Sequence, residues 1–190
     1  MNTRMMQVLS VVALAMTLGG LSACSNYQKD PDGTAKMSEE AQLRDAAAQT
    51  IRRFRAEDPT LDKFFNTAAG YAVFPEVAKG GAGIGGAYGK GVLYENGMVV
   101  GYCSVKQATI GAQLGGQTFS EMIFFENQRN VETFKAGDVE FSAEATAVAA
   151  SKGAAAKADY AEGIAIFILG QQGLMAEAAI GGQKFNYWTD

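Results

Sequence analysis

The chain of 190 residues contains no histidine, and this absence excludes several kinds of active site at once. Ser-His-Asp and Cys-His catalysis need an imidazole as the general base, and catalytic zinc sites are built mainly on histidine ligands. No serine lies in a G-x-S-x-G pattern. The sequence therefore predicts a protein that is not an enzyme, with no catalytic residues, no metal and no cofactor. Carboxylates remain, but they are scattered and no motif pairs them: Glu121, Glu126, Glu132, Asp138, Glu140 and Glu144.

Basic residues are also few. The chain has 16 Lys+Arg against 20 Asp+Glu, a net charge of −4. General nucleic-acid binding requires a basic footprint, so we expect no nucleic-acid partner.

The first 23 residues have the layout of an export signal. Arg4 is their only charge, an apolar run from Val8 to Leu18 follows, and small residues come next. The apolar run is too short to cross a bilayer. An ordinary signal peptide with a chance cysteine, or a short membrane anchor, would give a similar pattern.

The boundary Leu21-Ser22-Ala23-Cys24 resembles the lipobox of bacterial lipoproteins. The resemblance implies cleavage before Cys24, a diacylglycerol thioether on its sulfur, and an amino group acylated by a chain such as palmitate. Two or three acyl chains suffice for stable anchoring. Ser25 follows the cysteine, and by the same resemblance this implies an outer-membrane lipoprotein facing the periplasm. Loss of residues 1–23 changes the net charge from −4 to −5.

Only two cysteines are present, so lipid on Cys24 would leave Cys103 without an intrachain disulfide partner. Cys103 lies in an apolar run, which favours a buried packing role over thiol chemistry.

Residues 24–37 are polar, with Pro31 and Gly33, and are typical of a flexible tether. A helix is then predicted from an N-cap at Ser38, with Leu43, Ala47, Ile51 and Phe54 on one face.

Further helical signals follow. Asp58-Pro59 predicts the cap and first turn of a short second helix. Gly137 predicts the end of another short helix.

From Gly70 onward the pattern favours strands. "YAVF" is a short strand that Pro75 is expected to stop, and Asn96-Gly97 predicts a type I′ hairpin turn. Apolar and polar residues alternate over 139–149, which predicts a strand there despite the alanines. Two more strands are expected on either side of a Gln-Gln-Gly turn.

Glycines recur in a pattern that first suggests a phosphate loop. Gly81, Gly83 and Gly86 have G-x-G-x-x-G spacing, but a strand and hairpin follow where a nucleotide site needs a helix. We therefore expect no nucleotide. Three similar segments instead suggest strands with one bare face, which favours a strongly coiled sheet or small barrel and close packing: "GAGIGGAY" (81–88), "GAQLGGQTF" (111–119) and "EAAIGGQKF" (177–185).

Four ordered blocks resemble the SYLF domain family: "AAGYAVFPEVAKGGAGIGGAYGKGVL", "ATIGAQLGGQTFSEMIFF", "VEFSAEATAVAA" and "GQQGLMAEAAIGGQKFNYW". They cover about residues 40–188, so residues 38–190 are expected to form one SYLF-like domain. We expect an α+β fold in which one or two N-terminal amphipathic helices pack on a strongly coiled, Gly-rich antiparallel sheet or small barrel.

The resemblance implies the SYLF fold for this chain, but it does not identify the ligand. Eukaryotic SYLF members bind phosphoinositide membranes and fungal members also regulate actin, but the periplasm offers neither. Bacterial members are often exported lipoproteins of unsettled role. The chain also has Ser151-Lys152-Gly153 where the family often has a Gly-Pro pair.

Two functions stay open. One is a lipid-binding or envelope-interaction domain, in which Arg52, Arg53 and Arg55 contact anionic lipid headgroups. The other is a structural or protein-binding periplasmic module whose acyl anchor is its only membrane contact. In that case Ile51 and Phe54 pack in the core and the arginines cap helix carbonyls. No feature of the sequence identifies a protein partner.

Overall fold

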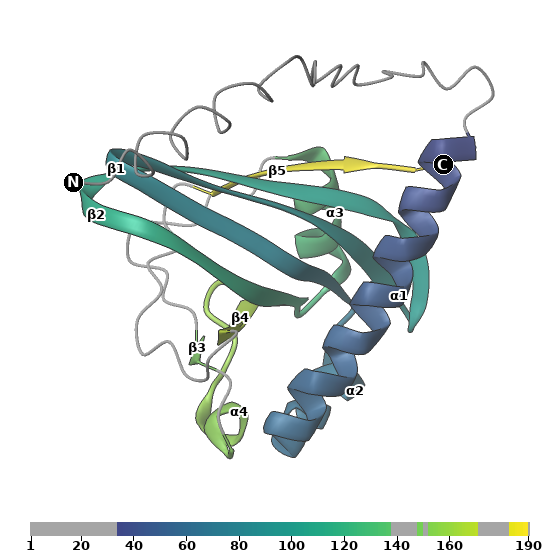
Figure 1. Ribbon diagram of the computed structural model, residues 1–190. Helices are drawn as coiled ribbons and strands as arrows, with labels where there is room; N and C mark the ends of the chain where they lie inside the picture. The colour runs from purple at the N-terminus through teal and green to yellow at the C-terminus, as the bar shows by residue number, and fades with distance from the viewer. Residues whose placement is uncertain (1–33, 138–147, 150–151, 171–182, 190) are drawn as a thin grey trace, which may run out of the picture. The chain divides into compact units, whose positions relative to one another are not determined.

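Two unusually long strands form the framework of the domain. The computed structural model describes residues 34–137, 148–149, 152–170 and 183–189. Strands β1 (Gly70–Glu95) and β2 (Met98–Phe125) pair antiparallel from end to end (Figure 1). Between them, Asn96 and Gly97 have φ angles of 50° and 75°, as the predicted type I′ turn requires.

Three shorter strands extend this hairpin into a five-stranded sheet. Strands β4 (Ile164–Gly170) and β5 (Gln183–Trp188) pair antiparallel with opposite ends of β2, and β3 (Val148–Ala149) pairs parallel with β4. Within the described ranges the sheet is open, so the small barrel that was one of the two expectations is not formed. The α+β class is confirmed.

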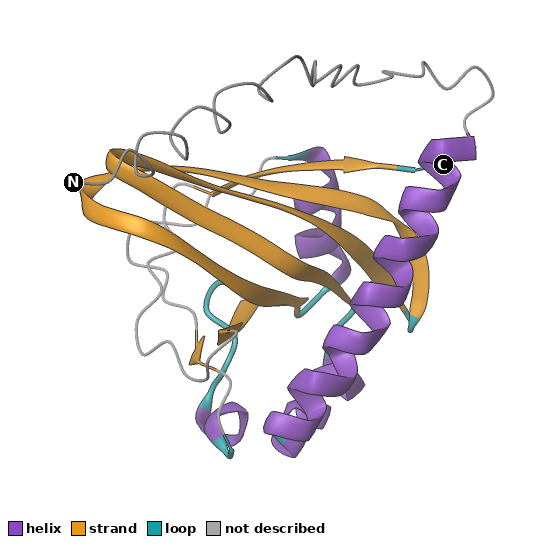
Figure 2. Ribbon diagram, in the orientation of Figure 1, coloured by secondary structure: helices purple, strands orange, loops and turns teal. Residues whose placement is uncertain are grey.

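Helices lie on both faces of the sheet, α1 on one and α3 on the other (Figure 2). One face of the sheet carries the three N-terminal helices: α1 (Thr34–Glu57), the 3-10 helix η1 (Pro59–Leu61) and α2 (Asp62–Thr67). The opposite face carries α3 (Gln128–Ala136), which ends at Gly137 as predicted, with a φ of 77°. The short α4 (Ala154–Lys157) follows β3.

The first helix begins earlier than expected. Its first residue is Thr34, four residues before the predicted N-cap Ser38, so residues 34–37 are helical and not part of the tether. The Ser38 hydroxyl instead donates to the carbonyl oxygen of Ala35 at 2.8 Å, inside the first turns. Such local bonding explains why a serine there is compatible with helix.

The sheet separates two hydrophobic cores. The α1-side core joins Phe54, Leu61 and Phe64 to the sheet residues Val73, Val92, Tyr94, Tyr102, Met122, Phe124 and Phe167. The α3-side core joins Val131 and Phe134 to Phe74, Val77, Leu93, Cys103, Val105, Phe119, Ile123, Phe125 and Phe185. Cys103 is fully buried, as predicted.

Strand β1 folds against itself, and glycine makes this approach possible. A Cβ on Gly91 would lie 2.7 Å from the carbonyl oxygen of Val73 and 2.7 Å from Cδ1 of Phe74. A Cβ on Gly89 would lie 2.7 Å from the carbonyl oxygen of Glu76. Because real Cβ atoms do not approach so closely, only glycine fits at Gly89 and Gly91. Gly89 continues the bare glycine face of the first repeat, at every second residue from Gly81, so the close packing predicted for that face is confirmed at this position.

The glycine-rich middles of the two long strands pair with each other. Gly80 is registered with Gly116 and Gly81 with Gly115, and the register then shifts by two residues of β2 between Ala82 and Gly83. Such an irregularity increases local bending and twist. The strongly coiled sheet that the glycine repeats predicted is thus built from the first two of them.

Pro75 does not stop the strand, contrary to expectation. The register shifts between Phe74 and Val77, which leaves Pro75 within a bulge of β1. A bulge is one of the places where a strand tolerates the missing N–H of proline. The Ser120 hydroxyl donates to the Pro75 carbonyl oxygen at 2.6 Å and closes this irregularity from β2.

Several predictions concern residues outside the described ranges. These are the signal 1–23, Cys24 and most of the tether, most of the strand expected over 139–149, and the larger part of the third glycine repeat. The last two residues of the expected strand, 148–149, are β3. Among the helices of the described ranges, none has the length and apolar character needed to cross a membrane.

We expect Gly91→Ala to lower the free energy of unfolding by roughly 1–3 kcal/mol, because the added methyl group forces the two halves of β1 apart. Gly116→Ala is the matched control, since its Cβ would meet its nearest neighbour, the Lys79 carbonyl oxygen, at 3.9 Å. Urea denaturation of both variants measures the difference. Equal stability of the two would contradict the close contact at Gly91.

Candidate functional site

The structure divides the arginine cluster at the end of α1. Phe54 is fully buried and Ile51 packs against the same α1-side core, while Arg52 and Arg53 are exposed. Neither Arg52 nor Arg53 forms an ion pair with any residue the structure describes.

Arg55 is held by its neighbours. Its Nε lies 2.9 Å from Oδ1 of Asp62, and its guanidinium lies 4.1 Å from the centre of the Phe65 ring. These contacts fix the turn between α1 and α2, so Arg55 serves the packing of these helices. Only Arg52 and Arg53 remain as candidates for the headgroup contact predicted for all three.

A groove runs between the first half of α1 and the sheet. One hollow of about 240 Å³ is lined by Lys36, Glu39, Glu40, Leu43, Lys90 and Trp188. A second, of about 290 Å³, shares Glu39, Leu43 and Lys90 and reaches Pro75 and Glu76. Lys90 pairs with Glu39, and this hydrogen bond raises the pKa of Lys90. Because Lys36 also pairs with Glu40, at 3.4 Å, the charges lining the groove are largely neutralised from within the domain.

Sequence reasoning did not find this groove. Lys90 and Trp188 are far from α1 along the chain, and only the pairing of β1 and β5 with β2 brings them beside it. In the sequence, the one hint of the groove was a lysine, Lys90, within a glycine-rich strand.

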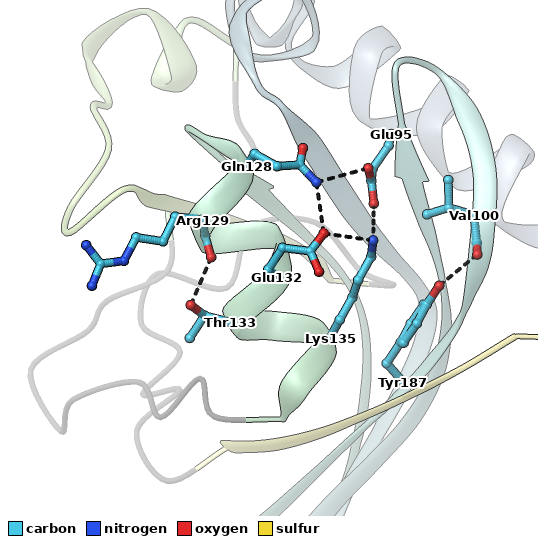
Figure 3. A network of polar contacts seen from close by, with 8 residues as sticks. All are labelled: Glu95, Val100, Gln128, Arg129, Glu132, Thr133, Lys135 and Tyr187. Atoms are coloured by element: carbon cyan, nitrogen blue, oxygen red, sulfur yellow. Dashed lines mark hydrogen bonds and ion pairs between the residues drawn. The ribbon is translucent and has the colours of Figure 1, made fainter.

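A polar network lies beside the hairpin turn, on the α3 side of the sheet (Figure 3). The Lys135 ammonium of α3 lies 2.6 Å from Oε1 of Glu95 and 3.1 Å from Oε1 of Glu132. The Gln128 amide donates to both carboxylates, at 3.3 Å and 2.9 Å. The Lys135 ammonium is paired with carboxylates of the same network, so these contacts join α3 to the end of β1.

Glu121 is the buried carboxyl of the α3-side core. Oε2 accepts a hydrogen bond of 3.2 Å from the amide of Gln183, and Oε1 has no hydrogen-bond partner among the residues described. Burial raises the pKa of Glu121 to about 7, although the Gln183 bond opposes this shift. Burial, together with Glu121, also raises the pKa of the Cys103 thiol well above its ordinary value, which favours the inert thiol form.

The surroundings of Glu121 in the described ranges are mainly apolar. The ring of Phe119 and the side chain of Ile123 belong to the same core, and in the described ranges no group of three or more cysteine, aspartate or glutamate side chains could hold a metal ion. A buried carboxyl in such surroundings makes the stability of the fold depend on pH.

Asp58 joins two segments that are distant in sequence. Oδ1 accepts hydrogen bonds from the backbone N–H of Thr60 at 3.0 Å, the Thr60 hydroxyl at 2.6 Å and the Gly153 N–H at 3.0 Å. Oδ2 accepts from the Ala155 N–H at 2.8 Å. Burial raises the pKa of Asp58, but the hydrogen bonds from Ala155, Thr60 and Gly153 outweigh it and the pKa is lowered. The predicted Asp58 cap is therefore confirmed, and it also holds the start of α4.

Taken together, the fold and these sites define an α+β domain with a strongly coiled glycine-rich hairpin, and no family model matches the chain. It is similar to Beta cell expansion factor A of Aeromonas veronii, with 32% identity over 142 residues, or 74% of the chain. The match covers 52% of that protein, so the chain spans about half the length of the curated relative.

Glu121→Gln should remove a pH dependence of stability. The folded protein holds a proton on Glu121 up to about pH 7, whereas the unfolded chain loses it near pH 4.5. Wild-type stability should therefore fall as the pH rises from about 4.5 to 7, by about 3 kcal/mol for this group. The variant should match the wild type near pH 4.5 and exceed it at pH 8 in urea denaturation. The exposed Glu126→Gln should follow the wild type, and identical pH profiles for all three proteins would contradict the buried carboxyl.

Asp58→Ala should lower the free energy of unfolding by roughly 2–3 kcal/mol, because two ends of helical segments lose their acceptor. Asp159→Ala is the control, since its partner Lys63 lies in an exposed ion pair of 3.3 Å and should contribute below about 1 kcal/mol. Thermal unfolding at neutral pH compares them. Destabilisation of the same size in both would show that Asp58 contributes no more than a surface charge.

Proposed function

We propose that the chain is a bacterial SYLF-domain lipoprotein. Its domain binds membrane lipid without catalysis and is held at the outer membrane, facing the periplasm, by acyl chains on Cys24. The observation that carries the proposal is the position of Cys24, directly after Leu21-Ser22-Ala23 and ten residues before α1 begins at Thr34.

The fold is compatible with the SYLF assignment. The first quoted block covers β1 and the second covers the last part of β2, and the glycines of the two blocks pair with each other. These two blocks therefore correspond to one structural unit, the coiled hairpin. The similarity to Beta cell expansion factor A, which extends over 74% of the chain, adds a bacterial relative.

Lipid binding by the domain itself is supported by its exposed, unpaired cations. Arg52 and Arg53 are candidates, since no acidic partner within the described part of the chain neutralises them. Each basic residue near an anionic bilayer contributes about 1 kcal/mol. Under the alternative, a structural or protein-binding module, these cations would stay solvated and only the acyl chains would contact the membrane.

Cys24→Ala should abolish lipid modification and leave the protein unprocessed or released from membranes, because the thioether needs the Cys24 sulfur. Cys103→Ala is the matched control and should remain anchored, since that thiol is buried in the core. Mass spectrometry of the mature N-terminus and membrane fractionation are the measurements. An unmodified Cys24, or cleavage at another position, would contradict the anchor.

A further inference from the structure

Three exposed side chains form a row across the sheet beyond the cover of α1. Lys106 of β2 is registered with Tyr88 of β1 on one side and with Lys184 of β5 on the other. All three are exposed, Tyr88 to 46%. We call Tyr88, Lys106 and Lys184 the lysine row.

The neighbouring positions show why this row is open. Residues directly opposite each other in an antiparallel pair lie on one face, as do alternate residues along a strand. Two positions toward α1, Lys90 already contacts Glu39 of that helix. Two positions further still, Val92 and Tyr102 are buried in the α1-side core. On the other side of the row, the next pair on this face is Gly86 and Ala108, and both residues are small.

The charges of the row are unfavourable for the fold taken alone. Lys106 and Lys184 are directly opposite, and like charges in such a pair destabilise a sheet. Neither forms an ion pair with a residue in the described ranges, whereas Lys36, Lys63, Lys90 and Lys135 each do. An anion bound at the row would relieve this repulsion.

The position of the row along the chain favours a membrane as the source of that anion. Lys90, which lies two residues after Tyr88 on the same face of β1, contacts Glu39 in the second turn of α1. The ten residues from Cys24 to Gly33 precede this helix and can extend at most about 35 Å. Arg52 lies 18 residues after Thr34, roughly 27 Å along α1, so the row lies nearer the end that joins the tether.

We propose that the lysine row is the surface by which the domain contacts anionic lipid headgroups, with Lys106 and Lys184 binding phosphate and Tyr88 lying at the bilayer interface. This inference rests on the proposed lipid-binding function and assigns its site. Lysines supply point charges for phosphate, and an exposed tyrosine has the amphipathic character typical of the interface. The row replaces the arginine cluster as the main contact.

The test uses the processed chain, residues 24–190, with Cys24→Ser so that no acyl chain contributes. Its binding to vesicles of phosphatidylglycerol and phosphatidylcholine is compared with binding to phosphatidylcholine alone, by sedimentation at low salt. Lys106→Gln with Lys184→Gln should weaken binding to the anionic vesicles about 30-fold, since each lysine near an anionic surface contributes about fivefold.

Two double variants with the same loss of charge are compared with the lysine-row variant, the first as the control and the second as the test of the arginines. Lys152→Gln with Lys157→Gln removes two exposed lysines, one just before α4 and one at its end. Arg52→Gln with Arg53→Gln removes the candidate cations at the end of α1. The Lys152/Lys157 control should bind within about threefold of the parent, and the arginine variant should lose less binding than the lysine-row variant. Thermal unfolding of the lysine-row variant should be unchanged or rise by a few degrees, because the repulsion between Lys106 and Lys184 is gone.

The outcomes separate the inference from the proposed function. Binding that the arginine variant abolishes and the lysine-row variant retains would overturn the lysine row and keep the lipid-binding domain. An equal loss in all three variants would show a dependence on net charge alone and would also overturn the row. Absence of binding to either vesicle would overturn the row together with lipid binding by the domain.

Discussion

The contact of β1 with itself at Gly89 and Gly91 is the constraint on which the rest of the structure depends. At both positions the space for a Cβ is occupied by backbone of the first half of the same strand. This approach bends the hairpin back on itself, and the alternation of residues along each strand sets which of them face α1 and which face α3. Without it, Phe74 and Phe185, whose ring centres lie 6.0 Å apart, would not meet in one core.

The two cores that result have different chemical character. The α1-side core is rich in aromatic contacts, and the Phe64 ring lies 5.0 Å from Phe167 and 5.4 Å from Phe124. The α3-side core contains the buried Glu121 carboxyl and the amide of Gln183. An orphaned carboxyl oxygen in such a place costs stability whenever the group is ionised. The α3-side core therefore makes stability respond to pH, while the α1-side core holds the helices in place.

The distribution of paired and unpaired charges decides which surfaces can bind an anion. Lys135, Lys90 and Arg55 are each held by a carboxylate of the domain and contribute to its architecture. Surface pairs of this kind have modest energies, but they leave little free charge for a partner. The lysine row has the opposite property, because its two cations face each other across β2 and β5.

The sequence by itself determined the local elements. Asn96-Gly97 specified its turn because both residues accept a positive φ, and Asp58-Pro59 specified a helix start through a side-chain acceptor and a fixed proline φ. The burial of Phe54 followed from the helical spacing of apolar residues, and that of Cys103 from the apolar run around it. Such features depend on residues within a few positions of one another, which a sequence displays directly.

Only the tertiary structure decided the features that join distant residues. The continuation of β1 through Pro75 depends on a bulge that Ser120 closes from β2. Arg55 differs from Arg52 and Arg53 because Asp62 and Phe65 hold it. Asp58 joins the start of α4 because it accepts hydrogen bonds from Gly153 and Ala155. The opposition of Lys106 and Lys184 depends on strand register across more than 70 residues of chain. Register is set by the packing of both sheet faces and by the bulges of β1 and β2, and neither can be read from a local pattern.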